Sequence, residues 1–226
     1  MITPAPIPPV FVVSAPSGTG KTTLNRRLVK EHPEVELSVS YTTRAKRQGE
    51  IEGVHYHFVT REYFQGLIDR GEMLEYAEVF GTLYGTPKDE LRRLAQAGKK
   101  ALLEIDVQGW KQAKGLLPGA VSIFILPPSV ETLWQRLEGR GTEPLAVRWR
   151  RLMAAKAEIE SGGNYDHFIV NHSLEGAYSE LQGIIINGEK SKMSAANGAA
   201  LCQDLLREFA TAPWIDALRA ELSKAT

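Results

Sequence analysis

The chain has little cysteine and no excess of charge of either sign. Its 226 residues include a single cysteine, Cys202, which excludes an internal disulfide and a zinc cluster built on several thiolates. The 27 basic residues are balanced by 27 acidic residues, whereas a protein that coats a polyanion needs a basic excess. We therefore expect neither a disulfide scaffold nor a nucleic-acid partner.

The chain also lacks long apolar runs. None approaches the length of about 18 residues that a membrane-spanning helix needs, so we expect no membrane segment. Residues 1–9 carry four prolines and no positive charge, which is typical of a loose arm rather than of a signal peptide. The hydrophobic content of 43% is enough for a core. These features predict a cytoplasmic α/β protein of one domain, with or without an inserted lobe.

A phosphate-binding signature stands near the start of the chain. Residues 10–13 are apolar and β-branched, as in a buried strand, and a helix is expected to begin near Lys21. Between them, Ala15, Gly20, Lys21 and Thr22 match the pattern G-x-x-x-x-G-K-[ST], except that alanine replaces the first glycine. The strand before the motif and the helix after it are the context that a P-loop requires.

The chemistry of this loop is that of anion binding. Gly18 and Gly20 can adopt the positive φ angles that turn successive backbone N–H groups inward, at a helix N-terminus whose dipole favours an anion. Lys21 adds a positive charge, and Thr22 can offer its hydroxyl to Mg²⁺. The residues expected to bind ATP phosphates are Ala15, Pro16, Ser17, Gly18, Thr19, Gly20, Lys21, Thr22 and Thr23.

A second group of cations follows in the chain. Arg44, Lys46 and Arg47 are expected on one loop, between a half-exposed strand at residues 37–41 and another strand at residues 56–58. With nearby hydroxyl groups, three cations suit a phosphate group. On charge alone, a solvated loop is the open alternative. The hydroxyl groups belong to Ser40, Thr42 and Thr43.

Two acidic residues close an apolar segment that we expect to be a core strand over residues 101–106. Glu104 and Asp106 are two positions apart, so on a strand both would face one side. Burying two carboxylates there is costly without a cation, which favours a functional role over packing. Asp106 also stands where a P-loop protein needs a carboxylate to hold the water shell of magnesium.

Another pair of acids lies on a strand expected over residues 72–80. Glu75 and Glu78 would face opposite sides of it, so at most one of them can point into a given cleft. Residues 81–87 are rich in turn formers and are expected to form a turn. Pro87 suits the first turn of the next helix.

The second half of the chain predicts two more core strands and a basic loop. Residues 120–126 and 166–171 are short and apolar, as buried strands are. Between them, the segment after residue 139 is flexible and basic, and we interpret it as a candidate lid that carries Arg140 and Arg151. A solvated charged helix is the open alternative for Arg136, Arg148 and Arg150.

The end of the chain carries no motif. We expect a linker over residues 187–199 and an amphipathic helical stretch over residues 200–222, which Pro213 kinks or splits. Such a stretch would dock on the body of the protein or on a second subunit. The sequence leaves the choice between a monomer and an oligomer open.

Over residues 10–186 the chain resembles the guanylate kinase family, P-loop enzymes that pass a phosphoryl group from ATP to GMP or dGMP. The blocks Ser-Tyr-Thr-Thr-Arg at residues 40–44 and Ile-Asp-Val-Gln-Gly at residues 105–109, in this order, are specific to that family. The resemblance implies an α/β fold of three αβα layers, with a parallel core sheet, an inserted GMP-binding lobe and a mobile lid. It places the core at residues 10–36, 91–138 and 156–186, the lobe at 37–90 and the lid at 139–155.

The resemblance also implies roles for individual residues. The ATP side would consist of the P-loop and Asn171, with Mg²⁺ held by Thr22 and, through water, by Asp106. The groups acting in phosphoryl transfer would be Lys21, Asp106, Arg140 and Arg151. On the GMP side, the phosphate would be held by Arg44, Arg47, Tyr56 and Tyr84, and the guanine by Ser40, Glu75, Thr86 and Glu104.

The chemistry of guanine supports the role of Glu75. Guanine presents N1–H and N2–H₂ donors on one edge, and a carboxylate can accept from both. Adenine would leave that carboxylate unpaired, a mismatch that can discriminate by about 10⁴.

Two alternatives stay open. A non-catalytic interaction module of the same family would lose the P-loop lysine or the lid arginines, which this chain keeps. A P-loop kinase for another phosphate ester, such as a ribose bisphosphate, would not need Glu75 and Thr86 beside the arginine loop.

Overall fold

The computed structural model describes residues 8–79, 81–139 and 143–224, so Arg140 lies outside the described residues. The strands are β1 (Val10–Ser14), β2 (Val35–Leu37), β3 (Tyr41–Thr42), β4 (His57–Phe58), β5 (Met73–Val79), β6 (Thr82–Pro87), β7 (Lys100–Leu103), β8 (Val121–Leu126) and β9 (His167–Val170). The helices are α1 (Lys21–Glu31), α2 (Arg61–Asp69), α3 (Lys88–Gln96), α4 (Val107–Ala113), α5 (Val130–Glu138), α6 (Leu145–Glu160), α7 (Leu174–Asn187), α8 (Ala195–Thr211) and α9 (Pro213–Lys224), with a 3-10 turn η1 at Lys114–Leu116. Across these ranges every helix is too short or too polar to cross a lipid bilayer.

The larger sheet is the parallel core that the sequence predicts. Its strand order is β2-β7-β1-β8-β9, and β1 with β7, β2 with β7 and β8 with β9 all pair in parallel. Strand β1 is buried along its whole length, as its apolar residues require. The predicted α/β class with a parallel core sheet is therefore confirmed.

The chain divides into two compact units, and β1 passes from one into the other. The first unit holds the chain up to Val12 together with Asn25–Val121, and the second holds Val13–Leu24 and the chain from Ser122 onward. The P-loop therefore belongs to the second unit, and the arginine loop at residues 44–47 belongs to the first.

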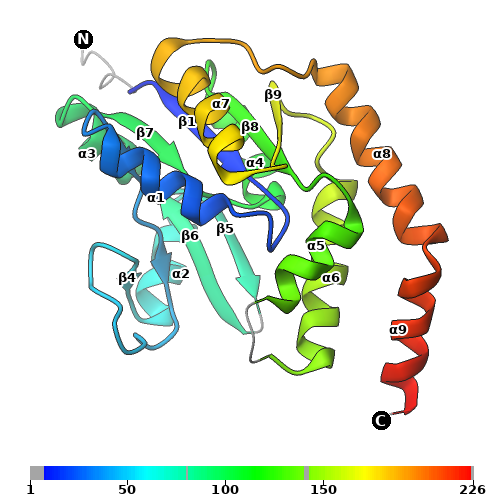
Figure 1. Cartoon of the computed structure of the whole chain (residues 1–226). Helices are drawn as coiled ribbons and strands as arrows, with labels where there is room; N and C mark the ends of the chain where they lie inside the picture. Colours follow the sequence, from blue (N-terminus) through cyan, green and yellow to red (C-terminus); the bar gives the residue numbers. More distant parts are fainter. Residues whose placement is uncertain (1–7, 80, 140–142, 225–226) are drawn as a thin grey trace. The chain divides into compact units, whose positions relative to one another are not determined.

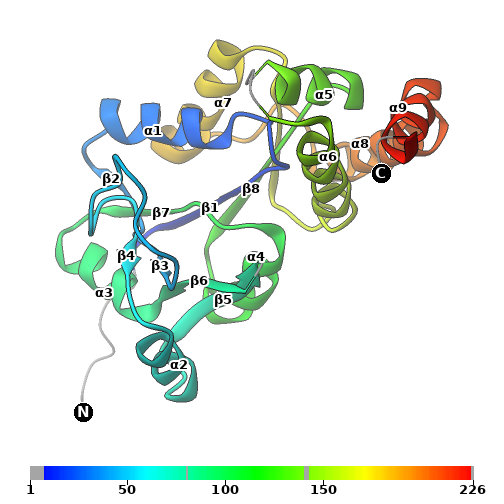
Figure 2. The same ribbon diagram turned by 90° about the horizontal axis from the view of Figure 1, so that it is seen from below.

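The first unit contains a smaller sheet with the order β4-β3-β6-β5. Helix α2 lies against this sheet (Figure 2), and its Phe64 and Leu67 join Met73 and Leu83 in a separate apolar core. Thr60 begins α2 as its N-cap, because its hydroxyl accepts the N–H of Tyr63. The small core gives the lobe a packing centre of its own.

The prediction of a turn over residues 81–87 is wrong, because Thr82–Pro87 form strand β6. This strand pairs with β5 on one side and with β3 on the other, so tertiary hydrogen bonding overrides the local turn signal. Gly85 marks a close approach of backbones rather than a turn, since a β-carbon there would lie 2.5 Å from the carbonyl oxygen of Glu75. Pro87 ends the strand and serves as the N-cap of α3.

The strand expected at residues 37–41 is interrupted. Its first part belongs to β2 in the large sheet and its last part to β3 in the small sheet, with Ser38–Ser40 between them. The backbone N–H of Val39 donates instead to the carboxylate of Glu90, at 2.8 Å. The chain changes sheets here, which an alternating pattern alone does not reveal.

Strand β7 is shorter than predicted and ends at Leu103. Glu104 and Asp106 therefore follow the strand, and the argument that both face one side of it is wrong. Asp106 is the N-cap of α4, because its carboxylate accepts the N–H of Gly109 at 2.7 Å. A strand ends where a capping residue begins the next helix.

In the second unit, α8 and α9 lie on the side of α5 and α6 (Figure 1). Helix α8 contacts both of these helices and strand β9. The expected split at Pro213 is confirmed, since α8 ends at Thr211 and α9 begins at Pro213. The linker is shorter than predicted, because Ser194 caps α8 and accepts the N–H of Asn197. Gly198 lies against the ring of the buried Phe168, where a β-carbon would overlap the ring.

Replacing Gly198 by alanine should destabilise the protein, although alanine usually favours a helix by about 1 kcal/mol over glycine. The added methyl group would overlap Phe168, and overpacking of this kind typically costs about 1–3 kcal/mol. Urea unfolding of the variant measures the change. Gly66→Ala in α2 is the matched control, because its β-carbon meets only the flexible end of Arg70, and it should raise stability. A gain of stability in Gly198→Ala would contradict the packing of α8 on β9.

Candidate active site

The P-loop turn forms as the sequence predicts. Gly18 and Gly20 have φ angles of 93° and 98°, values that L-residues rarely adopt. Between them, Thr19 is fully buried, and its hydroxyl and backbone N–H both donate to the carbonyl oxygen of Pro16, at 2.7 and 3.1 Å. Lys21 then opens α1, so the loop leads directly into a helix N-terminus.

Helix α6 holds the P-loop at Ser17. Arg151 donates to the hydroxyl of Ser17 from two guanidinium nitrogens, at 3.2 and 3.3 Å, and Glu158 accepts the backbone N–H of Ser17 at 3.0 Å. Arg151 is also paired with Glu143 at 2.8 Å. The structure thus places the predicted catalytic Arg151 beside the loop. Sequence reasoning missed Glu143 and Glu158, which belong to no motif.

Asn171 lies under the same loop. Its side-chain nitrogen donates to the carbonyl oxygen of Thr19 at 2.7 Å, while its side-chain oxygen is buried without a partner. A buried amide oxygen without a donor is costly, so this atom is suited to accept a hydrogen bond from a ligand. Arg136 donates to the carbonyl oxygen of Asn171 at 2.8 Å, so its interpretation as a solvated helix residue is wrong. Burial lowers the pKa of Arg136.

The hydroxyl groups at the start of α1 are accessible. Thr22 and Thr23 are exposed and Lys21 is half-buried, all in the first turn of the helix. The predicted phosphate and magnesium groups of this helix turn are therefore reached by solvent.

In the first unit, Arg44 sits in a clamp of aromatic and acidic side chains. Glu50 accepts from both terminal guanidinium nitrogens, at 2.6 and 2.5 Å, and the guanidinium lies 5.2 Å from the ring centroid of Tyr56 and 5.5 Å from that of Phe58. The hydrogen bonds from Arg44 hold the pKa of Glu50 down to about 2. Arg44 is thus an ordered cation, against the solvated-loop alternative. Glu50 is a partner that charge counting alone did not identify.

The other predicted phosphate ligands gather unevenly around Arg44. The rings of Tyr56 and Tyr84 meet edge to face with centroids 5.8 Å apart, and Tyr84 contributes to the hydrogen bonding of Arg44. Burial raises the pKa of Tyr56, with the charges of Tyr84 and Glu104 contributing. Arg47, in contrast, is exposed, and its backbone N–H donates to the carboxylate of Glu50 at 2.8 Å.

Glu75 is a buried acid of this unit that has no cationic partner among the described residues, whereas the equally buried Glu90 is paired with Arg93. Only 7% of the residue is exposed, and burial raises the pKa of its carboxyl group to about 7, with the neighbouring Asp106 adding to the effect. The side chain and the backbone of Thr86, its partner on β6, donate to it. Of the two acids on β5, Glu75 is therefore the one that points inward, while Glu78 is exposed and paired with Arg61.

The predicted residues Ser40 and Glu104 belong to the same unit as Glu75. The hydroxyls of Ser40 and Thr86 are 3.0 Å apart. Gly109 leaves room for Glu75, since a β-carbon there would lie 2.9 Å from a carboxylate oxygen. Glu104 accepts from the side chain of the fully buried Asn25 at 2.9 Å. The unit therefore offers a guanidinium clamp and a buried carboxyl group with hydroxyls.

Each unit offers one predicted residue with the oxygen chemistry that Mg²⁺ prefers, Thr22 in the second unit and Asp106 in the first. Among the described residues no group of three or more His, Cys, Asp or Glu side chains could hold a metal by itself. Thr22 and Asp106 provide hard oxygen donors, and Mg²⁺ commonly takes only one or two protein ligands and completes its shell with water and phosphate. The residues are thus compatible with the predicted role of Mg²⁺.

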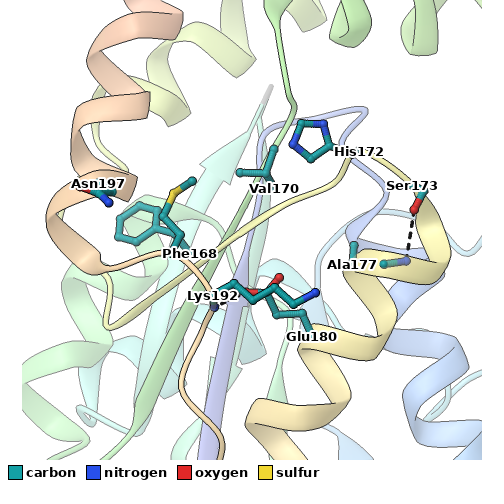
Figure 3. Close-up of a pocket in the computed structure, with 10 residues that line it drawn as sticks. Phe168, Val170, His172, Ser173, Ala177, Glu180, Lys192 and Asn197 are labelled. Carbon is teal, nitrogen blue, oxygen red and sulfur yellow. Dashed lines mark hydrogen bonds between the residues drawn. The ribbon is translucent and has the colours of Figure 1, made fainter.

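A cavity of about 380 Å³ opens in the second unit among β9, α7 and the start of α8 (Figure 3). His172, Glu180 and Lys192 are among its lining residues, but no predicted ATP-binding residue is. Glu180 already accepts the backbone N–H of Lys192 at 2.7 Å, and Ser173 caps α7. The polar groups at this cavity thus hold the segment that leads into α8.

The raised pKa of Glu75 predicts a pH dependence of stability in the protein without nucleotides. Because the folded state favours the protonated carboxyl group, its stabilising contribution is complete below the ordinary pKa of about 4.3 and is lost as the pH rises through about 7. The loss is of order 3 kcal/mol. Glu75→Gln should abolish this part of the slope in urea unfolding between pH 4.5 and 8, and the exposed Glu78→Gln should keep it. Identical slopes for Glu75→Gln and the unmodified protein would contradict the assignment.

Comparisons with known proteins show the family of the chain. The family model described as Guanylate kinase matches residues 8–187. The guanylate kinase of Chromobacterium violaceum is 44% identical over 92% of this chain and 97% of its own, and that of Neisseria gonorrhoeae is 51% identical over 78% and 86%. The crystal structure of guanylate kinase from Anaplasma phagocytophilum is similar with a TM-score of 0.64 and 34% identity, over 92% of this chain and 96% of that one. This chain belongs to the guanylate kinase family.

Proposed function

We propose that this chain transfers the terminal phosphoryl group of ATP to GMP, and to dGMP on the same site, forming ADP and the nucleoside diphosphate. The observation that carries the proposal is the buried Glu75 carboxyl group, flanked by the Ser40 and Thr86 hydroxyls in the unit that also holds the Arg44 clamp. A carboxylate, two hydroxyls and a guanidinium are the complement of a guanine edge and a phosphate. Neither a non-catalytic module nor a ribose phosphate kinase requires this set.

On the guanine side, Glu75 accepts the N1–H and N2–H₂ groups of the base. The base replaces the water that burial has removed, and its donors favour the ionised carboxylate. Ser40 and Thr86 offer hydroxyls to the remaining guanine acceptors, and Glu104 completes the site. AMP, which presents an acceptor in place of N1–H, would leave the carboxylate buried and unpaired.

On the phosphate side, Arg44 binds the GMP phosphate together with Arg47, Tyr56 and Tyr84. Arg44 is already ordered by Glu50 and the aromatic rings, whereas the exposed Arg47 becomes ordered on binding. The phosphate competes with Glu50 for the guanidinium nitrogens, so binding exchanges one anion for another.

On the ATP side, the P-loop N–H groups and Lys21 bind the phosphates, and the partnerless oxygen of Asn171 accepts from the amino group of adenine. Thr22 and, through water, Asp106 would hold the Mg²⁺ that accompanies ATP, which would supply positive charge to the phosphates.

The transfer needs no nucleophilic side chain, because the GMP phosphate is itself the nucleophile. A GMP phosphate oxygen attacks the γ-phosphorus in line, and the bond to the β-γ bridging oxygen of ADP breaks. Lys21, Arg140 and Arg151 stabilise the charge on the transferring group. In this proposal residues 37–90 serve as the GMP lobe and residues 139–155 as the lid.

The proposal includes a cytoplasmic location, where both nucleotide substrates are found. It includes no nucleic-acid partner, in keeping with the balanced charge of the chain.

Lys21→Met should lower kcat by roughly 10²–10³-fold, as removal of one transition-state donor typically does, with little change in stability. The assay couples ADP release to NADH oxidation, with GMP, dGMP, AMP or ribose 1,5-bisphosphate as acceptor at fixed ATP and Mg²⁺. Lys30→Met is the matched control, because Lys30 is an exposed lysine at the far end of the same helix. Near-normal turnover of Lys21→Met would refute the ATP-side assignment, and preference for a ribose phosphate over GMP would refute the proposed function.

Glu75→Gln should raise the KM for GMP by roughly 10- to 100-fold, the range expected for a lost hydrogen bond to a charged group, while the KM for ATP stays nearly constant. In the unmodified protein, GMP affinity should rise between pH 6 and pH 8, because binding requires the ionised form of a carboxyl group with a pKa of about 7. Calorimetric titration with GMP across this range tests both points. The assignment is wrong if Glu75→Gln binds GMP as tightly as the exposed control Glu78→Gln.

A further inference from the structure

Helix α9 contacts both of the helices that residues 139–144 connect. The ring of Trp214 on α9 lies 6.2 Å from that of Trp134 on α5, and the guanidinium carbon of Arg219 lies 6.0 Å from the ring centroid of Trp149 on α6. Ile215 is 1% exposed and anchors α9 between these contacts. The end of the chain therefore holds α5 and α6 together.

A second attachment comes from α8. The two carboxylate oxygens of Glu208 accept the N–H groups of Val130 and Glu131, at 2.9 and 3.1 Å, at the N-terminus of α5. An anion at this position is favoured by the helix dipole, and it supplies partners for N–H groups that the helix itself cannot satisfy. Helix α8 itself packs against strand β9 through Gly198. Glu208 therefore connects the N-terminus of α5 to the core sheet.

Helix α6 carries the tail contact and the P-loop contact close together. Trp149 is two residues before Arg151, which donates to the Ser17 hydroxyl at 3.2 and 3.3 Å. One residue earlier, Arg148 lies 5.3 Å above the ring of Trp134. Through the rings of Trp134 and Trp149, α9 thus contacts α5 and the part of α6 that carries Arg151.

We infer that Trp214 and Arg219 are positioning residues for phosphoryl transfer, because they fix the rotation and axial position of α6 and so the place of Arg151 over the P-loop. The inference rests on the proposed function for the role of Arg151. Displacements of about 1 Å at a reacting centre can cost two orders of magnitude in rate, so a small shift of α6 matters. Helix α9 lies beyond residues 8–187, which the family model matches, so this support is separate from the family's motifs.

The test compares full-length variants in the same coupled assay. Arg219→Ala should lower kcat two- to fivefold, which corresponds to the roughly 0.5–1 kcal/mol of an exposed cation–π contact, and should leave the KM for GMP unchanged. Arg219→Lys should restore most of the loss, since a lysine can also lie over the ring of Trp149. Arg207→Ala is the matched control, because Arg207 is an exposed arginine of the preceding helix that pairs with Asp204 one turn away.

A double-mutant cycle separates positioning from general stability. If Arg219 acts through Arg151, adding Arg219→Ala to Arg151→Ala should produce no further loss of kcat. Multiplicative losses in the double variant would overturn the inference, as would a lowered melting temperature with unchanged kcat in Arg219→Ala. Trp214→Phe and Trp214→Ala repeat the comparison at the second contact, where phenylalanine should retain activity and alanine should lose it. An unmodified protein inactive on GMP would contradict the proposed function itself, whereas an active one with Arg219→Ala equal to Arg207→Ala contradicts only this inference.

Discussion

A guanidinium that is to bind a phosphate is stabilised by a negative charge beforehand, and two of the predicted cations of this protein, Arg44 and Arg151, are each paired with a carboxylate. Arg44 is held by Glu50 with side chains only 13% and 17% exposed, and Arg151 is held by Glu143 with side chains 22% and 35% exposed. The more buried pair is less screened by solvent and therefore the more rigid of the two. Under the proposed function, nucleotide binding would exchange one anion for another on cations that are already oriented, in a chain of zero net charge.

Glu75 shows the opposite arrangement. Its carboxyl group is buried away from water, and it accepts hydrogen bonds from Thr86 rather than from a cation. A carboxyl group with a pKa of about 7 is poised between its two forms near neutral pH, so a ligand that brings two N–H donors shifts it to the ionised form. Under the proposed function, selectivity for guanine and the pH dependence of the free protein would have the same physical origin, the desolvation of one side chain. The stability that this burial removes from the protein without nucleotides is regained only by a ligand with the right donors.

The sequence was sufficient to predict the features that depend on local chemistry. The strand, glycines and helix of the P-loop are confirmed, and so is the break at Pro213. The failures concern residues whose partners are distant in the chain. A turn is expected over residues 81–87 because glycine and proline, here Gly81, Gly85 and Pro87, are local turn signals, but residues 82–87 form a strand because they pair with β5 and β3. Glu143 and Glu158 have no motif, and only the packing of α6 on the P-loop reveals what they do.

The same distinction explains how the end of the chain relates to the active site. A phosphate loop of successive N–H groups binds anions by itself, but an arginine on a neighbouring helix is useful only if that helix is held in register. In this protein two sets of contacts fix the position of α6. Its Glu158 and Arg151 bind Ser17 of the P-loop, and its Trp149 contacts Arg219 of α9. Helices beyond the matched domain can therefore act on the rate of transfer without contacting either nucleotide. A tail with no motif of its own can vary in sequence while it keeps this role, because the contact requires only an aromatic ring and a cation at the right height on α9.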